Sequence, residues 1–131
     1  MKKTFFLFLV FIYSINCYSQ SKVDIAFQKV KSFYMTYSKQ TKGYEYSIHY
    51  NKFDKTLDIN EHTIPILYIK VKYNYVDEYS DNTVQFRCPD DSYCIGGPHK
   101  SEFGLSEAFK TKEQCYTFID LLSDLKDAIE K

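Results

Sequence analysis

The sequence predicts an α+β protein in which an antiparallel sheet is accompanied by an N-terminal and a C-terminal helix. Three observations carry this prediction. Apolar residues recur at three- and four-residue spacing near both ends of the chain, as in helices that pack one face against a core. Between these ends, polar and apolar residues alternate in short runs, which is typical of strands with one buried face. Turn residues separate the runs, so we expect an antiparallel meander of about five to six strands.

Two segments have the helical spacing. Residues 23–38 place their apolar side chains on one wide face, and Gly43 follows where the helix is expected to have ended. Residues 111–129 repeat the pattern, and Thr111 with Gln114 fits a capping box at the start. Both helices should therefore pack against the sheet.

Five runs of alternating residues predict the strands. These runs are residues 44–50, 56–60, 64–76, 83–88 and 101–109. In the longest run, Ile66 and Leu67 belong to opposite alternations, which predicts a bulge or bend between them. Pro65 has no amide donor and suits such a position. In the last run, Phe103 and Leu105 are in phase, so we expect them to face the same side.

Residues 1–20 have the parts of a secretory signal. Lys2 and Lys3 give the basic start, and residues 5–12 form an unbroken apolar run. That run is shorter than the ~20 apolar residues that a membrane span needs. We therefore expect cleavage at the end of this segment and a secreted or periplasmic protein consisting of one α+β domain, residues 21–131.

A lipoprotein is the alternative, with Cys17 lipidated after cleavage. Ile15 and Asn16 precede this cysteine where small residues are expected, which favours the ordinary signal. The alternative would tether the same domain to the outer membrane.

The charge balance argues against a nucleic-acid partner. The chain has 17 basic and 17 acidic residues. Loss of Lys2 and Lys3 with the signal leaves 15 basic and 17 acidic residues, a net charge of −2. A nucleic-acid-binding surface requires a basic excess. No second apolar segment follows the signal, so we expect no membrane span after its removal.

Two cysteines flank a tight acidic turn in the stretch TVQFRCPDDSYCI. An exported protein meets oxidising conditions, and a hairpin can bring Cys88 and Cys94 close enough to bond. We predict a disulfide between them. The alternative is a zinc site formed by Cys88, Cys94 and His99, but this spacing does not match the usual ligand pairs.

Cys115 lies on the apolar face of the last predicted helix. A buried inert thiol is the favoured interpretation, because free cysteine packs as a small hydrophobic residue. Pairing of Cys115 with Cys88 or Cys94 stays open at this point.

The candidate binding residues lie on the turn and on the loop that follows it. They are Asp90, Asp91, Tyr93 and His99. Loops on a rigid sheet often carry recognition, and an exposed tyrosine is a common anchor. The same turn residues are also explained by turn chemistry alone.

Motifs of catalysis are missing from the sequence: it has no nucleophile elbow, no HExxH and no phosphate-binding loop. We therefore assign no catalytic residue, metal or cofactor. The expected function is a non-catalytic binding module for an unknown protein or small ligand. The alternative is a metal-dependent or thiol-based enzyme that uses Cys88, Cys94 and His99.

The order of the predicted elements resembles two known folds. The sheet followed by a helix, over residues 44–129, resembles pleckstrin-homology-like domains, in which a C-terminal helix caps an open barrel. The helix followed by a meander, over residues 23–88, resembles cystatin-like folds. The first resemblance is preferred. The whole chain is similar to small uncharacterised exported bacterial proteins with this layout and a cysteine hairpin. These resemblances imply a fold and no particular activity.

Overall fold

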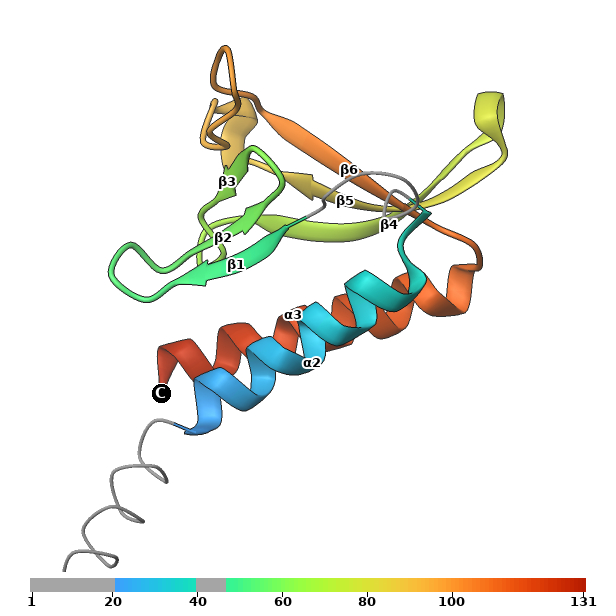
Figure 1. The fold of residues 1–131 in the computed structure, drawn as a ribbon. Coiled ribbons are helices and arrows are strands. Elements are labelled where there is room, and N and C mark those ends of the chain that lie inside the picture. The colour runs from blue at the N-terminus through green and yellow to red at the C-terminus, as the bar shows by residue number, and fades with distance from the viewer. Residues whose placement is uncertain (1–20, 40–46) are drawn as a thin grey trace, which may run out of the picture.

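The computed structural model describes residues 21–39 and 47–131 (Figure 1). Its long helices are α2 (Ser21–Tyr37) and α3 (Lys112–Glu130). Its strands are β1 (Ile48–Asn51), β2 (Thr56–Ile59), β3 (His62–Ile64), β4 (Lys70–Val76), β5 (Asp81–Arg87) and β6 (Gly104–Phe109). The predicted signal, Cys17 and Gly43 lie outside the described residues, so the interpretations that concern them stay predictions.

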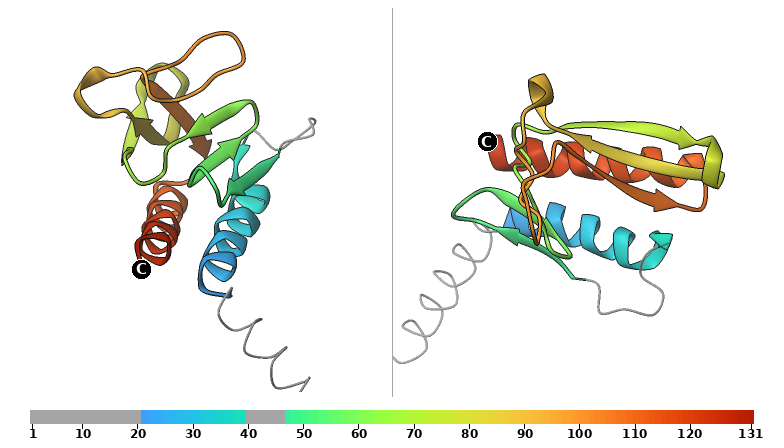
Figure 2. Two further views of the ribbon diagram at one scale, coloured as in Figure 1. Left: turned by 90° about the vertical axis from the view of Figure 1, so that its left-hand side faces the viewer. Right: turned by 90° about the horizontal axis from the view of Figure 1, so that it is seen from above.

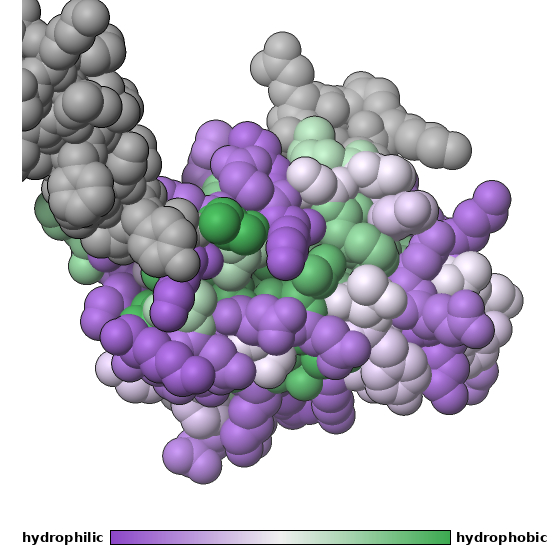
Figure 3. Space-filling model, turned by 90° about the horizontal axis from the view of Figure 1, so that it is seen from below, coloured by the Kyte–Doolittle hydropathy of each residue, from purple (hydrophilic) through white to green (hydrophobic). Residues whose placement is uncertain are grey.

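The two helices form one layer and the strands form another. α2 and α3 lie side by side in opposite directions, and Figure 1 and the left view of Figure 2 show them on the same side of the strands. The outward side of the helices is largely polar, with apolar side chains gathered near its middle (Figure 3). None of the helices in residues 21–39 and 47–131 combines the length and apolar character that crossing a membrane requires.

The strands are antiparallel, as predicted, but they form two sheets of three strands each rather than one meander. The strand orders are β1-β2-β3 and β4-β5-β6. In the first sheet Ile59 lies opposite Ile48, and in the second Val84 lies between Tyr73 and Glu107. The α+β class and the two helices are therefore confirmed, whereas a continuous five- to six-strand meander is not.

The division falls inside the predicted strand of residues 64–76, where the alternation changes phase. β3 ends at Ile64, and β4 begins at Lys70. Between them, the amides of Tyr68 and Ile69 both donate to the Pro65 carbonyl, at 3.0 and 3.1 Å. The chain therefore bends at the predicted position, through a turn rather than a bulge, and the turn satisfies backbone groups that a continuous ladder would have paired.

The core lies between the helix layer and the two sheets. Phe118 of α3 is fully buried, and its ring centroid lies 5.0 Å from that of Phe109, 5.9 Å from that of Tyr34 and 6.5 Å from that of Phe86. The predicted apolar face of α3 is confirmed. Its buried members are Cys115, Phe118, Leu122 and Leu125.

The predicted cap of α3 is also confirmed. The Thr111 hydroxyl oxygen accepts from the Gln114 amide at 3.1 Å, and the Gln114 side chain accepts from the Lys110 amide at 3.1 Å. These bonds satisfy amides that have no partner within the helix. The cap fixes where the last helix begins, directly after β6.

Candidate functional site

The predicted disulfide between Cys88 and Cys94 is present. The two Cα atoms lie 5.7 Å apart, across six positions of sequence. The Cys94 amide also points to the Cys88 sulfur, at 3.0 Å. The bond consumes both thiols that the zinc and thiol-enzyme alternatives would need.

The turn inside the disulfide is built from residues that tolerate a left-handed backbone. Asp90 and Asp91 both have φ of 55°, a conformation that aspartate adopts more readily than most residues. The amide and hydroxyl of Ser92 donate to the Pro89 carbonyl at 3.1 and 2.8 Å. Asp91 accepts from the Arg87 guanidinium at 3.2 Å. The short loop therefore has a defined shape.

Backbone hydrogen bonds tie this turn to the rest of the molecule. The Cys88 amide donates to the Phe103 carbonyl at 2.9 Å. Ile95 and Glu102 exchange two bonds, at 3.0 and 2.7 Å. Thr63 of β3 and Gly96 exchange two more, both at 2.9 Å. The segment after the turn thus bridges the two sheets.

An exposed aromatic patch lies beside the disulfide; we call Arg87, Tyr93 and Phe103 the tip patch. Tyr93 is 69% exposed and Phe103 is 49% exposed. Their rings meet edge to face with centroids 6.1 Å apart. The Arg87 guanidinium carbon lies 5.8 Å from the Phe103 centroid. Edge-to-face rings and a cation over a ring are both favourable arrangements.

Two of these three residues were missed by sequence reasoning. Phe103 was expected to lie in a strand in phase with Leu105, but β6 begins one residue later, at Gly104. A Cβ at Gly104 would lie 3.3 Å from the Phe86 carbonyl oxygen, so the chain approaches β5 closely there. The glycine was the available signal that the strand does not extend to Phe103.

His99 is exposed, and in the described part of the chain no hydrogen bond, ion pair or ring contact joins it to the tip patch. A different histidine is partnered, since His62 Nε2 lies 3.4 Å from Glu102 Oε2. Residues 21–39 and 47–131 contain no cluster of three His, Cys, Asp or Glu side chains that could hold a metal ion.

A second polar site is buried between α2 and β6. Glu107 is 2% exposed and Tyr34 is fully buried. The Tyr34 hydroxyl donates to Glu107 Oε2 at 3.1 Å. Burial raises the pKa of Glu107 to about 7, although the hydrogen bond from Tyr34 opposes the shift. Burial is the main cause of a raised pKa of Tyr34, and the negative charge of Glu107 raises that pKa further.

Sequence reasoning also missed this acid. Glu107 shares its strand parity with Leu105 and Phe109, so alternation alone placed a carboxyl on the core face. Alternation could not identify the hydrogen-bond partner of Glu107, because Tyr34 lies 73 residues away in the sequence.

Cys115 is buried and forms no disulfide in the described part of the chain. Burial raises the pKa of its thiol to about 11, so the nucleophilic thiolate form is disfavoured. The packing role predicted for this residue is confirmed, and pairing with Cys88 or Cys94 is excluded by their bond to each other.

Comparison of the chain with protein-family models, curated proteins and solved structures gives no match. The candidate site therefore rests on its own geometry. That geometry is a partly apolar, solvent-facing patch held by a disulfide and backbone hydrogen bonds.

Proposed function

We propose that this protein is an exported, non-catalytic binding module whose recognition surface is the tip patch. The single observation that carries the proposal is the contact between Tyr93 and Phe103. Two large rings meet at 6.1 Å while both remain substantially exposed. A molecule that covers them would remove apolar surface from water without first breaking the core.

Rigidity supports the same proposal. The disulfide fixes the start of the turn, and backbone bonds fix Cys88 to Phe103. A surface that is already ordered loses little conformational entropy on binding, so more of its contact energy is available as affinity. Tyrosine and arginine are also enriched among the residues that dominate binding energy at interfaces.

The surroundings indicate the chemistry of the partner. Asp90 and Asp91 are exposed beside the patch and offer carboxylate acceptors. A protein or small ligand that presents an apolar or aromatic group next to hydrogen-bond donors fits this combination. His99 is a peripheral candidate because it lies on the following exposed loop.

Export is the second part of the proposal. A disulfide forms and persists under oxidising conditions, and the sequence of residues 1–20 has the layout of a signal. The metal-dependent or thiol-based alternative gains no support, because it requires Cys88 and Cys94 as thiolates.

The test is photo-crosslinking in cells that export the protein. A photoreactive phenylalanine analogue replaces Tyr93 in one sample and Tyr79 in a control. Tyr79 is also 69% exposed, but it lies on the turn between β4 and β5. We expect a discrete crosslinked product from position 93 alone, and we expect Phe103→Ser to reduce its yield.

Equal products from both positions would show non-specific contact and overturn the proposal. The absence of any product from position 93, with correctly folded protein in the exported fraction, would overturn it as well.

A further inference from the structure

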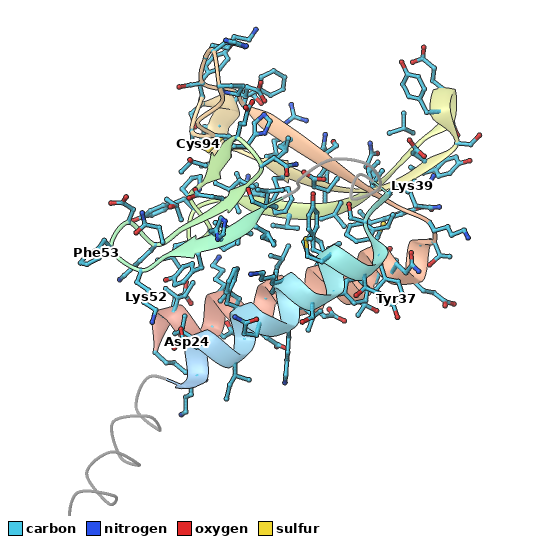
Figure 4. All side chains as sticks on the ribbon, viewed as in Figure 1. Asp24, Tyr37, Lys39, Lys52, Phe53 and Cys94 are labelled. Atoms are coloured by element: carbon cyan, nitrogen blue, oxygen red, sulfur yellow. A yellow bond between two sulfur atoms is a disulfide. The ribbon has the colours of Figure 1, made fainter. Side chains whose placement is uncertain are left out.

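The turn between β1 and β2 projects an aromatic side chain into solvent. Phe53 is 97% exposed, and Figure 4 shows its side chain pointing away from the molecule at the end of this turn. Lys52 and Lys55 lie on either side of it in the same turn. Among the described residues, Phe53 is the most exposed of the large apolar side chains.

The turn is ordered rather than loosely attached. The Asn51 side-chain oxygen accepts from the amides of Phe53 and Asp54, at 3.0 and 3.3 Å. The Asn51 side-chain nitrogen donates to the Asp54 carboxylate at 3.2 Å. Asn51 therefore fixes the turn, and it also forms a hydrogen bond with Asp54, the only acid in the turn. The exposure of Phe53 follows from this defined turn.

A pocket of about 520 Å³ lies beside the turn. Four lysines line it, and they come from three separate parts of the chain. They are Lys22 of α2, Lys52 and Lys55 of the turn, and Lys131 after α3. Val23 and Ile129 contribute apolar surface to the same pocket. The pocket thus combines ammonium groups with an apolar lining.

Four lysines and one acid, Asp24, are among the residues that line the pocket. Lys52 pairs with Asp24 at 3.1 Å, and Figure 4 shows Lys52 reaching from the turn towards Asp24 on α2. For Lys22, Lys55 and Lys131, no carboxylate of the described residues lies within 4.0 Å. This local excess contrasts with the balanced charge of the whole chain, 17 basic and 17 acidic residues.

We propose that this end of the molecule docks onto an anionic phospholipid bilayer. The docking end consists of Lys22, Lys52, Phe53, Lys55 and Lys131. Phe53 enters the boundary between headgroups and acyl chains, and the lysines contact headgroup phosphates. Aromatic residues favour that boundary, and lysines near an anionic leaflet add electrostatic attraction.

The docking end shares no residue with the tip patch, so each proposal can fail without the other.

Vesicle flotation of the purified protein tests the proposal. The vesicles contain phosphatidylcholine alone or phosphatidylcholine with phosphatidylglycerol, each at low and high salt. We expect flotation with the anionic vesicles at low salt, and loss of binding at high salt through screening of the lysines.

Two single variants should weaken that binding. Phe53→Ser should lower partitioning about tenfold, because the inserted ring is lost. Lys55→Ala should lower it about fivefold. Tyr79→Ser and Lys72→Ala are the matched controls, since both residues are exposed and neither is part of the docking end: Lys72 lies on β4 and Tyr79 on the turn that follows it. Both variants should bind as the unchanged protein does. Circular dichroism checks that all four variants fold.

Several results would overturn the proposal. These are equal binding to both kinds of vesicle, flotation that persists in Phe53→Ser and Lys55→Ala, and no flotation at all. A thermal shift with soluble glycerol phosphate, without vesicle binding, would identify the pocket as a site for small anions instead.

Discussion

Two aromatic clusters in this protein have similar ring contacts and opposite exposure. Around Phe118, centroid distances run from 5.0 Å to Phe109 to 6.5 Å to Phe86, and all three rings are fully buried. In the tip patch, Tyr93 and Phe103 meet at 6.1 Å and face solvent. Ring contact alone therefore does not distinguish a structural cluster from a recognition surface. What holds each cluster in place does distinguish them, since packing orders the first and a disulfide with backbone bonds orders the second.

The largest expected effect separates the clusters by stability. Phe118→Ala should lower the free energy of unfolding by about 3–5 kcal/mol, because it removes a buried ring and leaves a cavity. Phe103→Ala should change it by less than about 1 kcal/mol, because the ring is half exposed. Urea unfolding followed by circular dichroism measures both. Comparable losses in the two variants would show that the tip patch is part of the core.

The second prediction concerns the buried carboxyl group of Glu107. The pKa of Glu107 is about 7 in the folded protein, above its ordinary value of 4.5. The folded state therefore holds the proton more tightly than the unfolded state. The stabilisation that the folded protein gains from protonated Glu107 is fully present below pH 4.5. It is lost as the pH rises to about 7. The free energy of unfolding should fall by up to about 3 kcal/mol across that window.

Glu107→Gln should remove this pH dependence. The glutamine oxygen can still accept from the Tyr34 hydroxyl, and an amide carries no charge to be buried. Urea unfolding between pH 5 and pH 8 gives the comparison, with the exposed Glu78→Gln as control. A variant that keeps the full slope of the unchanged protein would assign the dependence to other groups.

The third and smallest effect concerns the disulfide. Replacing both Cys88 and Cys94 by serine should cost about 2 kcal/mol, because the bond closes a short loop. A reducing agent should lower the stability of the unchanged protein by a similar amount and leave the double variant unaffected. If the double variant responds equally to the reducing agent, the stabilisation does not come from this bond.

The elements that were predicted correctly depend on local information. The apolar spacing of α3 and its Thr111–Gln114 cap are properties of neighbouring residues, and both are present. The disulfide followed from two cysteines across a short turn. Antiparallel pairing followed from alternation and from turn residues.

The elements that were missed depend on partners distant in sequence. The segment that bridges the two sheets is held by the pair of hydrogen bonds between Thr63 and Gly96, 33 positions apart by residue number. Burial of Glu107 became intelligible only with Tyr34 in place. In the same way, the exposure of Phe103 depends on where β6 begins. The resemblance to pleckstrin-homology-like or cystatin-like folds stays a prediction.

The placement of Cys115 has a consequence for oxidative folding. An unfolded chain that carries Cys88, Cys94 and Cys115 can form three different single disulfides. The native partners are the closest pair in sequence, six positions apart, and a shorter loop closes at a lower entropic cost. Once α3 packs, Cys115 is withdrawn from solvent and its thiolate is disfavoured. Exchange with the native disulfide requires that thiolate. The short separation in sequence thus favours the Cys88–Cys94 disulfide at first. Burial of Cys115 then protects this disulfide from rearrangement.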